Sequence, residues 1–249
     1  MRALHALFVL LFGMLAACAG ETAAAGPCAE RLFEDDRFTV CTFDPEAQAL
    51  RLAWRGADGE AYRGFDALAR GIDQTRVAFA MNAGMFDQVG APIGLLVESG
   101  RELHAISTTE GPGNFHLKPN GVFWIDDAGA PHVTATDSYL ALKTSPEWAT
   151  QSGPMLLIDG ALHPAFDNDG VSRHIRNGVG VGDGGEAWFV ISEQPVSFGK
   201  LARFFRDSLA AHNALYLDGA VSSLWDPRAG RMDKGVPLGP LVVVCSPSC

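Results

Sequence analysis

Residues 77–86 read VAFAMNAGMF, an apolar stretch that ends in an asparagine, a small residue and a glycine. A short apolar segment bounded by turn-forming residues predicts a buried β-strand followed by a tight turn. Four further segments combine a polar residue, a Gly or Pro and an apolar strand in the same way. They are KPNGVF (118–123), QSGPML (151–156), RNGVG (176–180) and YLDGAVSS (216–223). These five segments predict a fold built mainly of strands, with polar residues at the strand ends.

The rest of the chain agrees with a β-rich fold. Further strands are predicted over residues 37–43, 49–54, 93–98, 187–192 and 241–244, and the motif segments extend to strands at 121–126, 155–158, 179–181 and 214–217. Two helices are predicted, one over residues 64–72 and one from residue 197 or 198 to about 211. The second carries an apolar stripe formed by Leu201, Phe204, Phe205 and Leu209. We therefore predict an α+β fold: a single β-dominated domain over residues 31–249, with a mixed or antiparallel bent sheet and a few helices.

Composition excludes several classes of protein. The 249 residues are 47% hydrophobic and 19% charged, and the formal net charge is −10. So much apolar content argues against a disordered chain. A negative net charge is the opposite of the basic surface expected of a nucleic-acid-binding protein, so no nucleic-acid partner is predicted.

The N-terminus has the form of a secretory signal. Arg2 provides the positive start and residues 4–15 an apolar run of about 12 residues, too short to span a bilayer. We interpret residues 1–17 as a signal peptide and residues 18–30 as a tether. Leu15-Ala-Ala-Cys18 resembles the lipobox of bacterial lipoproteins, in which Cys18 would carry a lipid anchor to a membrane surface. Ordinary cleavage after Ala19 also fits, and both alternatives predict an exported protein, periplasmic or membrane-anchored.

Four cysteines remain beyond Cys18: Cys28, Cys41, Cys245 and Cys249. An even number in an exported chain predicts two disulfides that secure the ends of the domain, with three connectivities open. Zinc ligands are usually spaced more closely, so a zinc site is the weaker interpretation.

Three other motifs are set aside because their context is wrong. Residues 180–185 (GVGDGG) match a dinucleotide-binding fingerprint, but a strand-like segment follows where a helix is required, so a β-hairpin is predicted instead. Residues 197–200 (SFGK) match an acylation motif whose partner motifs are absent, and Ser197 is well placed to cap the following helix. Residues 167–170 (DNDG) lack the bidentate Glu of a calcium loop and are interpreted as an acidic turn.

The polar residues of the five segments indicate a binding site only when they are considered together. Taken singly, Asn82 and Asn120 fit turn positions, Arg176 a surface ion pair and Asp218 a hairpin. Together they supply the few oriented polar groups and glycines that small-molecule sites use. We therefore predict one binding site assembled from all five segments.

This set, in this order, resembles the phosphodiester glycosidase family, and the resemblance extends over roughly the whole mature chain. The most specific parts are residues 82–86, residues 152–154, Arg176 with the Gly-rich segment that follows it, and residues 217–219 followed by Ser222. The chain departs from the family at Ala83, where Gly-Gly is common, and at Ala220, where a second Gly is common. The resemblance implies a hydrolase that cleaves the anomeric C–O bond of a sugar-1-phosphodiester, here in an envelope glycan.

The chemistry of that reaction suggests roles for individual residues. A guanidinium grips two phosphate oxygens and stays charged, so Arg176 is assigned to the departing phosphate. Asp218 is assigned to the anomeric centre, where a carboxylate stabilises positive charge or activates water. The proposed substrate-binding residues are Asn82, Gly84, Asn120, Ser152, Gly219 and Ser222. Lys118 and His116 are secondary cations, and Glu193 and Asp87 are reserve carboxylates.

No cofactor and no metal-binding residues are assigned, although a divalent cation is left open. Two alternatives remain open. One is a glycan-binding lipoprotein without catalytic activity, and the other is a metal-dependent phosphodiesterase that cleaves P–O instead of C–O.

Overall fold

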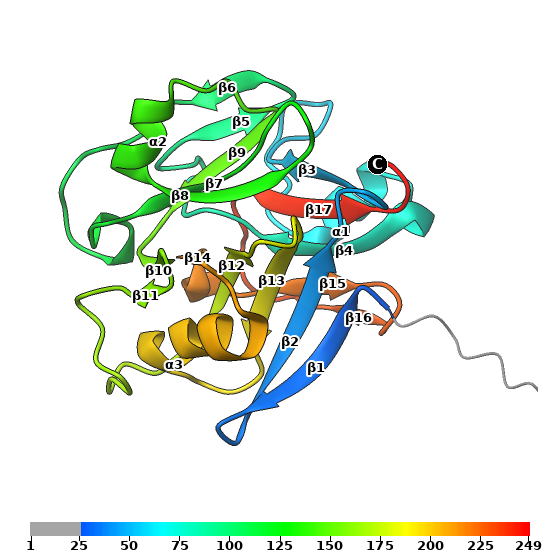
Figure 1. The fold of residues 1–249 in the computed structure, drawn as a ribbon. Helices are drawn as coiled ribbons and strands as arrows, with labels where there is room; N and C mark the ends of the chain where they lie inside the picture. Colours follow the sequence, from blue (N-terminus) through cyan, green and yellow to red (C-terminus); the bar gives the residue numbers. More distant parts are fainter. Residues whose placement is uncertain (1–25) are drawn as a thin grey trace, which may run out of the picture.

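The structure, a computed structural model, describes residues 26–249. The signal peptide, Cys18 and the first part of the tether lie outside the described residues. Strands dominate the fold and form three sheets, and every pairing between adjacent strands is antiparallel (Figure 1). The predicted α+β class is therefore confirmed, with three antiparallel sheets in place of one bent sheet.

The sheets have the following strand orders. The first contains β1 (Cys28–Phe33), β2 (Asp36–Phe43), β13 (Ala187–Ser192), β12 (Asn177–Val181), β14 (Asn213–Tyr216), β10 (Met155–Ile158) and β11 (Ala161–Leu162). The second contains β16 (Arg231–Met232), β15 (Leu224–Asp226), β4 (Val77–Asn82), β17 (Leu241–Cys245) and β3 (Ala49–Ala53). The third contains β6 (Arg101–His104), β5 (Leu96–Glu98), β9 (Trp148–Ser152), β7 (Gly121–Ile125) and β8 (Pro131–Ala135).

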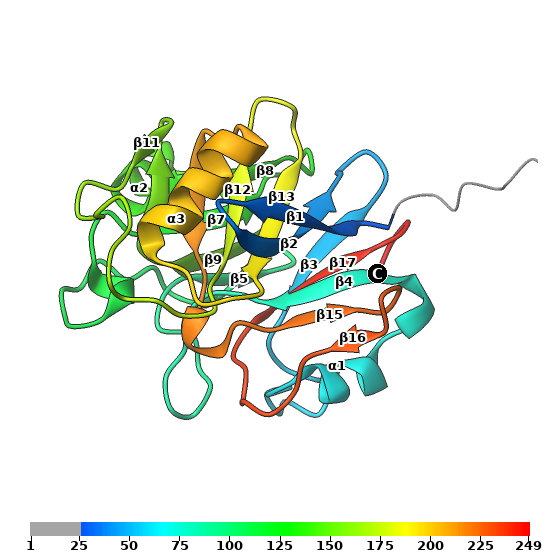
Figure 2. The same ribbon diagram turned by 90° about the horizontal axis from the view of Figure 1, so that it is seen from below.

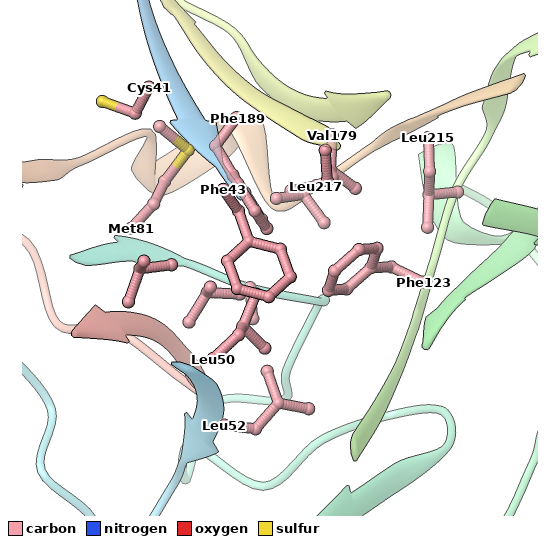
Figure 3. Packing of buried hydrophobic residues seen from close by; sticks show 14 of the residues in the cluster. Cys41, Phe43, Leu50, Leu52, Met81, Phe123, Val179, Phe189, Leu215 and Leu217 are labelled. Carbon is pink, nitrogen blue, oxygen red and sulfur yellow. The ribbon is translucent and has the colours of Figure 1, made fainter. Parts of the chain in front are cut away.

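Each sheet turns one face to a shared central core and is covered by a short helix on the other. In β17, Val242 and Val244 belong to the central core, whereas Leu241 and Val243 pack with Phe65 of α1 (Phe65–Gly71). A strand buried on both faces needs apolar residues at every position, which explains why the sequence of β17 is apolar throughout. Figure 3 shows side chains from β2, β3, β4, β7 and β13 meeting in this core.

The other two helices cover the remaining sheets (Figure 2). In α2 (Thr136–Leu142), Tyr139 packs on Trp124 of the third sheet, with ring centroids 5.8 Å apart. Helix α3 (Phe198–Arg203) continues directly into the π-helical turn η3 (Phe204–Ser208) and covers the first sheet, where Phe204 stacks on Phe38. Three 3-10 turns complete the elements: η1 (Gln74–Arg76), η2 (Asn114–His116) and η4 (Gly219–Val221).

Most predicted strands appear within one or two residues of their expected bounds, but the 93–98 strand shortens to Leu96–Glu98. Sequence reasoning missed α2, which is short and buries only Thr136 and Tyr139. It also missed β1, which begins at Cys28, inside the segment interpreted as a tether. The GVGDGG segment forms the predicted hairpin: Val181 of β12 pairs with Ala187 of β13, and Gly185 adopts a φ of 85° at the turn.

The two predicted disulfides are present. Cys28 is bonded to Cys41, its direct partner across β1 and β2, and Cys245 at the end of β17 is bonded to Cys249. Each bridge thus secures one end of the described chain.

Candidate active site

A cleft of about 720 Å³ opens beside the C-terminal end of β14. Its walls come from the loop before β12, from the η4 turn and from the segment after β16. The lining residues are Asn114, Ser172, His174, Ile175, Arg176, Tyr216, Gly219, Ala220, Val221, Ser222, Ser223, Asp233, Lys234 and Val236. Three of the predicted site residues, Arg176, Gly219 and Ser222, therefore meet in one cleft.

Arg176 lines this cleft although only 1% of its surface is exposed, and its guanidinium makes several hydrogen bonds. Its Nε donates a hydrogen bond to the Val196 carbonyl at 2.8 Å. Its Nη1 donates to the Tyr216 hydroxyl at 3.1 Å, and its Nη2 to the Ser172 carbonyl at 3.0 Å. The Phe198 ring lies 3.6 Å from the guanidinium carbon. The guanidinium plane is thus fixed from its edge and from one face.

None of these partners carries a negative charge. Within residues 26–249 no carboxylate lies within ion-pair distance of Arg176. Burial lowers the pKa of Arg176 from its ordinary value, but a guanidinium remains protonated in proteins. Each Nη carries two N–H groups, so Nη1 keeps one beyond its bond to Tyr216. A buried cation with neutral partners and an N–H to spare favours an anionic ligand.

Asp218 follows β14 and caps the η4 turn. Its carboxylate accepts hydrogen bonds from the backbone N–H of Ala220, at 3.2 Å, and of Phe86. Burial raises the pKa of Asp218 from 3.8 to about 6, against the opposing effect of these two N–H groups. Asp218 does not itself line the cleft, whereas Gly219 and Ala220, the next two residues, do.

Asn82 and Asn177 form a buried network beneath the η4 turn. The Asn82 amide nitrogen donates to the Asp218 carbonyl at 2.7 Å, and its oxygen accepts from Asn177 Nδ2 at 3.0 Å and from the Ser223 N–H at 2.9 Å. Ser222 Oγ lies 3.2 Å from Asn177 Oδ1. Asn82 therefore ties β4 to β12 and to the η4 turn, and its side chain is occupied by protein partners.

The remaining predicted substrate-binding residues lie outside the cleft lining. Asn120 is 2% exposed and donates to the Phe115 carbonyl at 2.9 Å. Ser152 is fully buried, and its hydroxyl has no hydrogen-bond partner among the described residues. A Cβ at Gly84 would collide with the Gln151 carbonyl, so this glycine is required by close packing on β9.

The four secondary candidates are used elsewhere in the structure. Lys118 donates to the Thr108 carbonyl at 2.7 Å, and His116 Nδ1 lies 3.1 Å from the Thr109 carbonyl, so both join the same loop. Glu193 forms an ion pair with Arg231 at 2.6 Å. Asp87 accepts hydrogen bonds from the N–H groups of Val89 and Ala91 within its own turn. None of the four lines the cleft.

Sequence reasoning missed Tyr216, Ser172 and Phe198, which hold Arg176 in place. Tyr216 lies two residues before Asp218, and the alternation of side chains along a strand could have pointed to it. The sequence pattern places Phe198 only at the start of a helix. The predicted acidic turn is attached to that helix, because Ser197 Oγ donates to Asp169 at 3.0 Å.

In the described part of the chain, no three His, Cys, Asp or Glu side chains are arranged to hold a metal ion. Across the same residues, no helix has the length and apolar content needed to cross a bilayer.

Comparison with known families gives a clear match. The family model for phosphodiester glycosidases matches residues 75–230, which include Asn82, Arg176, Asp218 and Ser222. The chain belongs to this family. A relative from Escherichia coli, the uncharacterized protein YigE, is 36% identical over 209 residues, which cover 81% of this chain and 79% of that protein.

Solved structures share the fold of this chain. The catalytic domain of zebrafish N-acetylglucosamine-1-phosphodiester alpha-N-acetylglucosaminidase, auto-inhibited by its pro-peptide, aligns with a TM-score of 0.59 at 15% identity, over 88% of this chain and 81% of that one. A putative exported protein from Burkholderia pseudomallei aligns with a TM-score of 0.56 at 13% identity, over 85% of this chain and 74% of that one. At such identities the likeness concerns the fold alone.

Proposed function

We propose that this protein hydrolyses the anomeric C–O bond of a sugar-1-phosphodiester, with Arg176 binding the phosphate that departs. The observation that carries the proposal is the positive charge of Arg176, which is 1% exposed, lines the cleft and is bonded only to neutral groups. Membership of the family supports the reaction class.

The reaction requires a cation that stabilises the departing phosphate and a carboxylate that acts at the anomeric carbon. When the C–O bond breaks, its electron pair passes to a phosphate oxygen, and a guanidinium in a water-poor site stabilises that negative charge. A phosphate is a weakly basic leaving group, so a strong general acid is less necessary than for an ordinary glycoside.

We assign Asp218 to the developing positive charge or to the attacking water. Its pKa of about 6 leaves it ionised at neutral pH while keeping it a better base than an ordinary carboxylate. The overall reaction converts water and the diester into a free sugar, a phosphate monoester and one proton.

We further propose that the protein acts outside the cytoplasm on an envelope glycan. The support is the signal-like N-terminus and the two disulfides. Anchoring through Cys18 belongs to this proposal.

Hydrolysis in oxygen-18 water tests the reaction. The probe is N-acetylglucosamine 1-(methyl phosphate), within a panel of other sugar-1-phosphodiesters, with rapid analysis of both products by mass spectrometry. We expect the label on the anomeric hydroxyl of the sugar. Label on the phosphate would contradict the proposal and indicate a phosphodiesterase, whose chelator sensitivity would then be measured. Binding without turnover across the panel would also contradict it and indicate a glycan-binding protein.

A matched pair of variants tests the role of Arg176. Arg176→Lys keeps a positive charge but loses the fork geometry, and we expect its KM for the phosphodiester to rise about tenfold or more. Arg173→Lys alters an exposed arginine paired with Asp169, and should leave KM unchanged. An unchanged KM in folded Arg176→Lys would contradict the phosphate-binding role.

A further inference from the structure

The phenolic O–H of Tyr216 can donate a hydrogen bond, and no acceptor for it is found among the described residues. Tyr216 ends β14, is 2% exposed and lines the cleft. Its oxygen accepts the hydrogen bond from Arg176 Nη1 at 3.1 Å, and the structure shows no other partner for it among the described residues. Because the arginine supplies the hydrogen in that bond, the phenol keeps its own O–H for another acceptor.

The surroundings hold this hydroxyl neutral and in place. Burial raises the pKa of Tyr216 above its ordinary value, although Arg176 acts in the opposite direction, so the phenol stays protonated. The ring packs edge-on against Phe198 at 4.7 Å, and the Tyr216 backbone N–H donates to the Pro154 carbonyl at 3.0 Å. The group therefore has little freedom to turn away.

The η4 turn packs closely against the hydroxyl, which reaches the cleft through the lining position of Tyr216. A Cβ on Gly219 would collide with the Tyr216 oxygen and ring, so only glycine fits there. Gly219 also lines the cleft, and Asp218, immediately before it, is close enough to raise the pKa of Tyr216. Tyr216 thus contacts the residue assigned to the phosphate and lies two positions before the residue assigned to the sugar.

We propose that Tyr216 is a further catalytic residue, whose O–H donates a hydrogen bond to the phosphate oxygen that departs from the anomeric carbon. This inference rests on the proposed function. As the C–O bond breaks, its electron pair moves to that oxygen, and the hydrogen bond strengthens because the acceptor becomes more negative. The proton stays on Tyr216. Arg176 assists twice, by binding the phosphate and by polarising the phenol through its own hydrogen bond.

Tyr216→Phe removes the hydroxyl and keeps the ring. The control is Tyr139→Phe, which removes the hydroxyl of another buried tyrosine, on α2 and away from the cleft lining. With N-acetylglucosamine 1-(methyl phosphate), we expect kcat to fall about 10- to 100-fold in Tyr216→Phe, with KM changed less than about threefold. Tyr139→Phe should match the wild type in both constants.

Leaving-group dependence separates a chemical role from a structural one. A 4-nitrophenyl phosphate departs as a weaker base than methyl phosphate, so Tyr216→Phe should lose less activity on the 4-nitrophenyl diester. Equal losses on both substrates, a rise in KM that accounts for the loss, or an unchanged kcat would each overturn the inference. If the wild type itself is inactive on the panel, the proposed function fails and this inference fails with it. An active wild type with an unaffected Tyr216→Phe overturns the inference alone.

Discussion

Asp218 combines a partly buried carboxyl group with a position just after the end of a strand. Burial raises its pKa from 3.8 to about 6, and two backbone N–H groups fix its orientation. A carboxyl group with a pKa near the working pH exchanges protons more readily than an ordinary one, which is a common property of catalytic acids and bases. The same burial makes ionisation costly for the folded protein.

The activity should therefore depend on pH through Asp218. If the carboxylate form is required, kcat/KM should fall as the pH is lowered through about 6, because protonation removes the negative charge. A pH–rate profile of the wild type on a sugar-1-phosphodiester measures this limb. Asp218→Asn should lose most turnover at every pH while remaining folded. Substantial turnover in folded Asp218→Asn would show that the residue has no catalytic role.

Stability provides a second readout of the same group. The folded state holds the Asp218 proton up to about pH 6 and the unfolded chain only to about 3.8, so stability is lost as the pH rises through this window. One pKa unit corresponds to about 1.4 kcal/mol, so Asp218→Asn should gain about 2 to 3 kcal/mol relative to the wild type between pH 4 and pH 8. Asp127→Asn, at an exposed carboxyl group, should show no such gain.

At the scale of elements, α3 links the acidic turn to the cleft. Ser197 is fully buried, and its Oγ accepts from the Lys200 N–H at 3.0 Å, which is the helix cap predicted from the sequence. The same hydroxyl donates to Asp169. Asp169 lies three residues before Ser172, whose carbonyl accepts from Arg176. The cap therefore also holds the loop that supports the arginine.

Removing this hydroxyl should destabilise the protein measurably. We expect Ser197→Ala to lower the free energy of unfolding by about 1 to 3 kcal/mol, since it removes the cap and leaves the buried Lys200 N–H without its partner. Urea denaturation of wild type and variant provides the measurement. The matched control is Ser208→Ala in η3, whose side chain makes no hydrogen bond that the structure describes. Equal effects of the two substitutions would contradict a capping role for Ser197.

Element prediction succeeded where the pattern was local. The apolar stripe of residues 201–209 placed the second helix correctly. It could not show that the helix changes to a π-helical turn at Phe204, where Phe204 and Phe205 are both packed in the core. Helix α2 is seven residues long and lacks a side-chain cap, so its sequence carries little signal. In β1, four of six residues are exposed, so the strand lacks a buried apolar face that the sequence could reveal, and its first residues fall in the Ala-, Gly- and Glu-containing segment interpreted as a tether.

At the scale of the whole molecule, the cleft is assembled from segments far apart in the chain. The family motifs indicated Arg176, Gly219 and Ser222 correctly as neighbours. They could not indicate which polar residues face solvent and which become structural links, because that depends on long-range pairing. The amide of Asn82 is occupied by Asn177, 95 residues away.

The two disulfides close loops of different size, and their contributions should differ accordingly. The cysteines of the Cys28–Cys41 bridge are 13 residues apart in the sequence, and those of the Cys245–Cys249 bridge are 4 apart. The longer loop restricts the unfolded chain more. Loop-entropy arguments give about 3 kcal/mol for the first bridge and about 2 kcal/mol for the second.

Single substitutions at the less buried cysteine of each bridge test this without opening a cavity. Cys28→Ala leaves the fully buried Cys41 side chain in the central core, and Cys249→Ala leaves the buried Cys245 in place. We expect Cys28→Ala to lower the free energy of unfolding more than Cys249→Ala, because β1 is a largely exposed edge strand that the bridge fastens to β2. Denaturation of both variants and of the wild type, with and without reductant, measures the difference. A larger loss in Cys249→Ala, or no effect of reductant on the wild type, would contradict this account of how the ends of the described chain are held.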